Sequence, residues 1–196
     1  MPQRRIAGIS TGAIPSDHHG LSMKATIKPT STEIFFHEPE LIVSKTDLKG
    51  RITYANQTFC KMAGFSEAEL VGAPHSIIRH PDMPRAVFKL LWDTIMTGRE
   101  IFAYVKNMAR SGDFYWVFAH VTPSYDEKHN IVGFHSNRRV PDSAVIRNTI
   151  APLYAEVLRE EQKHANGQQE LAAGYSFLTK FLESKGTTYD ALIFSL

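Results

Sequence analysis

Apolar and polar positions alternate along five short segments of the chain, a pattern typical of β-strands. The first two segments, 41–46 and 51–55, are separated by a short turn sequence and predict a β-hairpin. The other three segments lie further along the chain, at 100–109, 114–124 and 131–140, with turn residues between them. We therefore expect five strands, of which the last three form consecutive antiparallel pairs.

Between the second and third of these segments the apolar spacing becomes that of helices. Asn56 is a candidate N-cap for a helix over 57–63, because its short side chain can accept a hydrogen bond from a free helical N–H. Ser66 begins a capping-box sequence, which predicts another short helix, and a longer helix is expected from 84 to 97. The order β-β-α-α-α-β-β-β indicates an α+β fold, with short helices on one face of a five-stranded antiparallel sheet.

The two ends of the chain differ from this central region, which spans 31–141. Residues 1–30 are rich in Ser, Gly, Pro, Thr and His without any period, so we expect a flexible N-terminal arm, and Met23 is a second candidate for the native start. Residues 142–196 have an irregular helical spacing of apolar positions, which predicts a helical extension for dimerisation or partner docking. The apolar strip at 191–196 needs a partner surface.

Composition narrows the classes of function. With 22 Lys and Arg against 20 Asp and Glu, the net charge of +2 does not indicate nucleic-acid binding. A single cysteine, Cys60, excludes a disulfide framework and a cysteine-rich zinc site, and fits the reducing cytoplasm. No stretch approaches the roughly 20 apolar residues of a membrane span, so we expect a cytoplasmic protein without direct membrane insertion. No catalytic motif such as G-x-S-x-G or H-E-x-x-H is present, which indicates that the chain is not an enzyme.

Candidate binding chemistry is concentrated in the segment Ile78-Arg79-His80-Pro81-Asp82-Met83-Pro84. Each proline fixes its own φ and keeps the preceding residue out of the α region, so we expect a rigid, extended loop. Directly after this loop, Phe88 and Trp92 are four residues apart in the expected helix and therefore lie on one face. Polar groups on a rigid loop beside an aromatic wall are suited to hold a flat cofactor.

The chain resembles the PAS sensor domain, and specifically the flavin-binding PAS domain of bacterial aerotaxis transducers, over about residues 28–160. The residues that carry the resemblance are Thr46-Asp47-Leu48, Ala55-Asn56, Gly72, Pro74-His75, Arg79-His80-Pro81-Asp82-Met83-Pro84, Val105-Lys106-Asn107 and Tyr115-Trp116-Val117. The resemblance implies a PAS fold with the strand order second, first, fifth, fourth, third. It also implies FAD, held between the helices and the inner face of the sheet.

Matched position by position, the resemblance implies seven side chains that contact FAD. They are Asn56, Arg79, His80, Asp82, Phe88, Trp92 and Asn107. An isoalloxazine ring needs apolar walls and a few directed hydrogen bonds, and Asn107 offers both a donor and an acceptor. Arg79 can meet a diphosphate or an anionic ring, as can His80 when protonated. Asp82 is better suited to orient these two side chains or to cap the next helix.

Three alternatives stay open at this point. A photoreceptor of the LOV type needs a cysteine over the ring where this chain has Arg79-His80-Pro81, whereas Cys60 lies in an earlier helix. A PAS sensor of haem b uses a histidine as axial ligand, for which His75, His80, His120 and His135 are candidates. His120 and His135 lie on the expected strands, and one of them would be the metal ligand. A PAS domain without a cofactor would act only in dimerisation or docking.

The function implied by the resemblance is signal transduction by a sensor that binds FAD and reports redox state or oxygen, as in aerotaxis and chemotaxis. No kinase or methyl-accepting region follows in the sequence. We therefore expect a homodimer that passes its signal in trans to a chemoreceptor-like or other signalling protein.

Overall fold

The computed structural model describes residues 27–196 of the chain. The part of the expected N-terminal arm at 1–26 therefore lies outside the described residues. The segment that follows is attached to the start of the fourth strand. The N–H of Thr30 donates to the carbonyl of Gly112 at 2.9 Å, and the N–H of Ile34 donates to the carbonyl of Phe114 at 2.8 Å.

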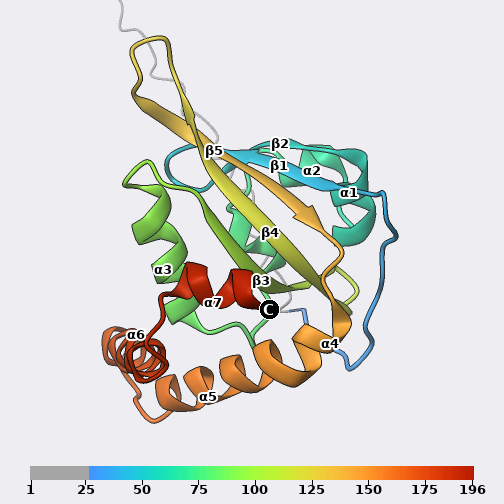
Figure 1. The fold of residues 1–196 in the computed structure, drawn as a ribbon. Coiled ribbons are helices and arrows are strands. Elements are labelled where there is room, and N and C mark those ends of the chain that lie inside the picture. The colour runs from blue at the N-terminus through green and yellow to red at the C-terminus, as the bar shows by residue number, and fades with distance from the viewer. Residues whose placement is uncertain (1–26) are drawn as a thin grey trace, which may run out of the picture.

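Five antiparallel strands form one sheet with the order β2-β1-β5-β4-β3, which confirms the topology implied by the resemblance. The strands are β1 (Ile42–Thr46), β2 (Ile52–Ala55), β3 (Ile101–Met108), β4 (Phe114–Tyr125) and β5 (Ile131–Arg139). Their bounds lie within one residue of those predicted from the alternating pattern. The central strand β5 pairs with β1, which is distant in sequence, so the sheet joins the first hairpin to the C-terminal half of the domain (Figure 1).

Four short helices follow β2 and precede β3 in the chain. They are α1 (Gln57–Ala63), α2 (Glu67–Leu70), the 3₁₀ helix η1 (His75–Ile78) and α3 (Arg85–Ile95). The predicted caps are present, because Asn56 Oδ1 accepts from the N–H of Phe59 at 2.9 Å and Ser66 forms a capping box with Glu69. The α+β fold class with five strands and short helices is thus confirmed.

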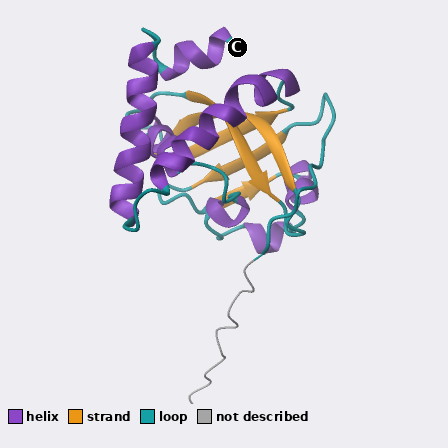
Figure 2. Ribbon diagram, turned by 90° about the horizontal axis from the view of Figure 1, so that it is seen from below, coloured by secondary structure: helices purple, strands orange, loops and turns teal. Residues whose placement is uncertain are grey.

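The C-terminal extension is helical and folds back onto the same domain. It consists of α4 (Ser143–Val145), the π-helical turn η2 (Ile146–Ile150), α5 (Ala151–Glu161), α6 (Gly167–Ser184) and α7 (Tyr189–Ser195). Helix α6 packs against α5 and α3, and α7 packs against β3, as the two ribbon views show (Figures 1 and 2). The apolar C-terminal strip therefore packs only in part against its own chain, because Ile193 is buried whereas Phe194 and Leu196 are exposed.

Both faces of the sheet are covered, and β4 shows which side chains belong to each face. Val117, Ala119 and Val121 point to the side of α3, which we call the inner face. Trp116 lies on the opposite, outer face, where its ring is 6.3 Å from that of Tyr154 in α5. The hydroxyl of Tyr154 also donates to the carbonyl of Tyr104 in β3 at 3.0 Å. The inner face therefore meets the short helices, and the outer face meets the extension.

Candidate functional site

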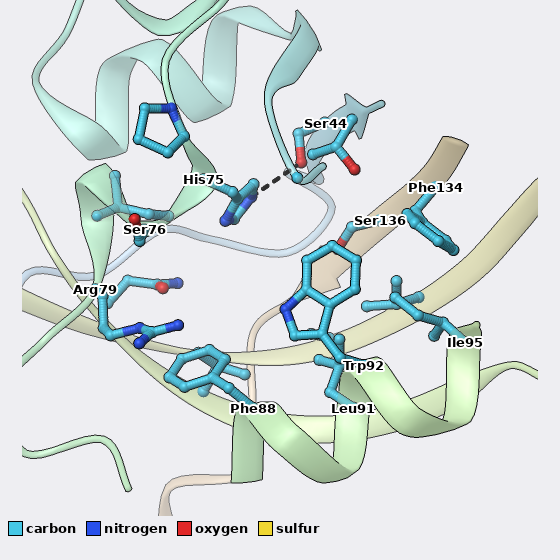
Figure 3. Close-up of a pocket in the computed structure, with 18 of the residues that line it drawn as sticks. Ser44, His75, Ser76, Arg79, Phe88, Leu91, Trp92, Ile95, Phe134 and Ser136 are labelled. Carbon is cyan, nitrogen blue, oxygen red and sulfur yellow. Dashed lines mark hydrogen bonds between the residues drawn. The ribbon is translucent and has the colours of Figure 1, made fainter. Parts of the chain in front are cut away.

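A cavity of about 260 Å³ lies between α3, η1 and the inner face of the sheet. Apolar and aromatic side chains of α3 form one wall, and Figure 3 shows them facing the 3₁₀ helix across the cavity. The sheet forms the floor. The lining residues are Ser44, Thr46, Lys49, Gly50, Pro74, His75, Ser76, Ile78, Arg79, Phe88, Leu91, Trp92, Ile95, Val105, Asn107, Ala119, Val121, Phe134, Ser136 and Arg138. This lining contains three cationic side chains and no Asp or Glu.

The aromatic wall is held at both ends by ring contacts. Phe88 and Trp92 lie one turn apart on α3, as their spacing predicts. The guanidinium carbon of Arg79 sits 4.0 Å from the centroid of the Phe88 ring, a cation–π contact. The Trp92 ring packs edge-on against Phe134 of β5, with centroids 5.4 Å apart. These contacts leave the wall apolar and fixed in orientation, as a flat ligand requires.

Asn107 provides an unpaired hydrogen-bonding group in the cavity floor. Its side chain is buried on the inner face of β3, and its Nδ2 has no hydrogen-bond partner among the described residues. Tyr115 lies directly opposite on β4, and its hydroxyl is also unpaired. Arg79 is joined to Asn107 by an isolated antiparallel bridge, so the proline-bounded loop is anchored to this strand. Buried polar atoms are rarely left unpaired in native proteins, so these two atoms indicate a missing partner.

A charged cluster lies in the same cavity. Nη2 of Arg138 in β5 donates to Ser44 Oγ at 2.6 Å and to His75 Nε2 at 2.6 Å. Burial, together with the charge of Arg138, lowers the pKa of His75 to about 3, so this ring is neutral at physiological pH. Burial lowers the pKa of Arg138 only to about 10, so the guanidinium keeps its charge. The cavity thus combines aromatic walls with a buried positive charge.

Comparison with known proteins places this architecture in a family. Residues 52–138 match the family model of the PAS fold, and they include four of the five strands and most of the cavity lining. This part of the chain has the PAS fold. The dark structure of the blue-light photoreceptor Aureochrome1 LOV has the same fold, with a TM-score of 0.51 and 23% identity over 59% of this chain and 86% of that chain.

Two curated relatives carry a similar PAS region. The chain is 41% identical to the aerotaxis receptor of Escherichia coli (strain K12) over 114 residues. This aligned region covers 58% of this chain and 22% of that receptor. Over 112 residues it is 30% identical to the nitrogen fixation regulatory protein of Klebsiella pneumoniae, covering 57% of this chain and 21% of that protein. The chain therefore matches about a fifth of the length of either relative.

The structure brings four of the seven predicted contact residues together in the cavity of the PAS domain. These are Arg79, Phe88, Trp92 and Asn107. The other three, His80, Asp82 and Asn56, are not among its lining residues. Cys60, the residue weighed for LOV-type chemistry, lies in α1 and does not line the cavity either.

His80 and Asp82 lie on the far side of the loop. The N–H of Asp82 donates to His80 Nδ1 at 3.1 Å, and the carboxylate of Asp82 pairs with Lys106 Nζ at 2.7 Å. The His80 ring packs edge-on against Phe114, with 5.8 Å between centroids. Burial lowers the pKa of His80, with a further contribution from the Lys106 charge, so the neutral ring is favoured. In this arrangement Asp82 orients His80, and neither side chain reaches the aromatic wall.

Asn56 is held by three hydrogen bonds from its side chain to the backbone. Its Oδ1 accepts from the N–H of Val43 at 3.0 Å as well as from the N–H of Phe59, and its Nδ2 donates to the carbonyl of Leu41 at 2.7 Å. The side chain therefore ties the first strand to the start of α1.

Of the four histidines considered as haem ligands, His75 lines the cavity, His80 lies on the loop outside it, and His120 and His135 lie on the outer face. His120 stacks on Phe102 with centroids 4.1 Å apart and pairs with Glu100 at 2.8 Å. His135 contacts Asn137, two residues along the same strand, at 3.1 Å. Neither lines the cavity, and within residues 27–196 no group of three or more His, Cys, Asp and Glu is arranged to hold a metal ion. None of the helices in this range has the length and apolarity of a membrane span.

The sequence-based expectations did not include Arg138 or Ser44 among the contact residues, and they included His75 only as a candidate haem ligand. A signal for Arg138 was present, because it shares its strand face with Phe134 and Ser136 at a spacing of two residues. A charged residue on the buried face of a strand is rare and marks a functional candidate. The pairing with His75 and Ser44 is not readable from the sequence, since these residues are 63 and 94 positions away.

Proposed function

We propose that the PAS domain binds FAD in this cavity and that the chain reports the oxidation state of the flavin to a separate signalling protein. The observation that carries the proposal is the unpaired Nδ2 of Asn107 beneath the Phe88 and Trp92 wall. A flavin ring matches this combination, because it has flat apolar faces and an edge of carbonyl and ring-nitrogen acceptors. The similarity to an aerotaxis receptor supports the sensory role.

The size and charge of the cavity suit this ligand. Its volume of about 260 Å³ is close to the lower end of the usual range for ligand sites, about 300 Å³, and fits a ring system without its nucleotide tail. Lys49 is an exposed cation in the lining, and Arg79 is also exposed on the loop. These two side chains are available to the diphosphate of FAD where it leaves the cavity.

Bound FAD supplies reversible electron uptake, and the protein residues carry the resulting change outward. Asn107 is bridged to Arg79, and the loop that contains Arg79 leads directly into α3. The first two N–H groups of α3, those of Arg85 and Ala86, donate to the carboxylate of Glu161 at 3.0 and 2.8 Å. Because Glu161 belongs to α5, a shift of hydrogen bonding in the cavity has a short path to the C-terminal extension.

The extension is the proposed output region of a homodimer that binds a chemoreceptor-like partner in trans. Most of its apolar residues pack within the chain, but Phe194 is 65% exposed and Leu196 is 40% exposed. These residues, together with the segment before β1, are the proposed contact surface. The proposal includes no enzymatic step and places the protein in the cytoplasm.

An absorption spectrum of the purified full-length chain tests the cofactor. We expect a flavin band at about 450 nm that bleaches with dithionite, and FAD as the species released on denaturation. A Soret band would instead identify haem, and a protein that carries no flavin and takes up no added FAD would overturn the proposal.

Two substitutions test the site itself. Arg79→Ala and Asn107→Ala each remove a proposed contact, and we expect each to weaken FAD binding by about tenfold, as loss of one good hydrogen bond does. Asn148→Ala is a matched control, because Asn148 is exposed on η2. Titration of FAD into stripped protein measures the affinities. Unchanged affinity in both cavity variants would contradict the assignment of the site.

A further inference from the structure

Arg138 is a buried cation whose hydrogen-bonding capacity is only partly used. The side chain is 3% exposed, its Nη2 is held by Ser44 and His75, and its Nη1 has no partner among the described residues. The face of its guanidinium rests over Phe59, with 5.0 Å to the ring centroid. Both of its polar partners are neutral, so nothing in this cluster compensates the charge.

The other side chains that line the cavity add to this uncompensated positive charge. Arg138 shares the lining with the cations Lys49 and Arg79, and the lining includes no carboxylate. A buried charge without a counter-charge is costly, and native proteins retain such groups where a ligand completes the pairing. Ser44 and His75 orient the guanidinium while leaving Nη1 free, which is the arrangement expected of a binding group.

We propose that Arg138, oriented by Ser44 and His75, forms an anion-binding end of the cavity that holds the negatively charged edge of a planar heterocyclic ligand. The inference rests on the proposed function in naming the ligand. For a flavin, the charged edge is the N1 and C2-carbonyl side of the ring, which becomes negative on two-electron reduction with uptake of one proton. Arg138 then favours the reduced, deprotonated ring over the oxidised, neutral ring.

The first experiment compares the wild-type holoprotein with Arg138→Gln and Arg138→Lys. With dithionite as electron donor and water as proton source, we expect Arg138→Gln to bind the reduced flavin about tenfold less tightly relative to the oxidised flavin. For a two-electron couple this factor corresponds to a midpoint potential about 30 mV lower. On reduction we also expect the Arg138→Gln holoprotein to take up two protons for every two electrons, whereas the wild type takes up one. Arg138→Lys keeps the charge and should retain the wild-type proton count.

Arg139→Gln is the matched control, because Arg139 is the next residue of β5, exposed and pointing to the other face. It should leave the potential and the proton count unchanged. If Arg138→Gln binds flavin with the same potential and proton count as the wild type, the role of Arg138 is refuted while flavin binding stands.

A second experiment separates the anion site from flavin binding altogether. Flavin-free protein is titrated with benzoate and with benzamide, which have nearly the same planar shape but differ in charge. We expect benzoate to bind about tenfold more tightly than benzamide, with the difference lost in Arg138→Gln and kept in Arg139→Gln. Equal binding of the two probes, or no binding of either, would contradict the anion site even if the protein carries FAD. A benzoate preference in a protein that takes up no flavin would uphold the site and refute only the proposed cofactor.

Discussion

The two faces of the sheet differ in the hydrogen bonding of their buried polar groups. On the inner face, three buried side-chain groups lack a partner among the described residues, namely Asn107 Nδ2, the Tyr115 hydroxyl and Arg138 Nη1. On the outer face, the buried Tyr154 hydroxyl is paired both with the Tyr104 carbonyl and with the Tyr189 hydroxyl, each at 3.0 Å. The buried hydroxyl that faces the extension is thus paired, whereas three buried groups on the cavity side of the sheet are not.

This difference bears on how one small domain combines stability with the ligand binding that we propose. Packed apolar side chains and the hydrogen bonds of Tyr154 on the outer face contribute free energy of folding. The inner face contributes less to the free energy of folding than full packing would, because unpaired polar groups and empty volume do not stabilise the fold until a ligand is bound. Substitutions on the outer face should therefore change mainly the stability of the fold, and substitutions on the inner face mainly the binding of the ligand.

The largest expected effect is on the outer face. Tyr154→Ala removes a fully buried ring and leaves a cavity between α5 and the sheet, so the free energy of unfolding should fall by about 3–5 kcal/mol. Flavin affinity of the folded protein should change little, because Tyr154 does not line the inner cavity. Denaturant unfolding measures the loss, with the exposed Tyr54→Ala as control. A parallel fall in flavin affinity at low temperature would show that the two faces are not independent.

The next effect is a pH dependence that belongs to the inner face. Since the pKa of His75 in the folded state is lowered to about 3 from 6.5, folding favours the neutral ring. The free energy of unfolding therefore has its full value above about pH 6.5. It declines as the pH falls toward 3, by at most about 1.4 kcal/mol per pH unit. His75→Gln removes this slope, and His135→Gln serves as the control on the outer face. Identical slopes in the wild type and His75→Gln would contradict the prediction.

A smaller effect is expected where the two regions meet. Glu161 is 3% exposed, and its carboxylate accepts the two N–H groups that begin α3. Glu161→Gln keeps the size but loses the negative charge and one acceptor oxygen, so stability should fall by about 1–2 kcal/mol. Hydrogen exchange should rise at Arg85 and Ala86 and remain unchanged in the exposed control Glu156→Gln. Equal protection in both variants would contradict a capping role.

Close packing around Glu161 explains why α6 contains a glycine at this point. A Cβ on Gly174 would lie 2.5 Å from the Cγ of Glu161, which is closer than real contacts allow. Burial raises the pKa of the Glu161 carboxyl, and the two backbone N–H groups oppose that effect. The cap therefore joins α3, α5 and α6 at one buried side chain.

The smallest effect on stability is expected for Asn107→Ala. The side chain has an unpaired Nδ2, so its removal should change the free energy of unfolding of the flavin-free protein by less than about 1 kcal/mol. Denaturant titration of stripped protein measures this value. A loss of several kcal/mol would mean that Asn107 has a structural role, and the contrast between the two faces would fail at this position.

Local features of the fold were predictable from the sequence because neighbours in the chain decide them. The Asn56 cap, the Ser66 capping box and the shared face of Phe88 and Trp92 depend on spacings of three or four residues. Strand bounds followed from alternation, and the family resemblance supplied the order of the strands in the sheet. The sequence therefore determined the five strands, the three α-helices between β2 and β3, the PAS fold and the aromatic wall, but not the 3₁₀ helix η1.

Which side chains meet in the cavity was decided only by the tertiary structure. On β4 the alternation has apolar residues on both faces, with Val117 inward and Trp116 outward, so the pattern could not show which face lines the cavity. His80 stood beside Arg79 in the sequence, yet the rigid loop turns it away from the cavity. Arg138 meets its partners only when β5 pairs with β1, because contacts over such long separations exist only in the folded sheet.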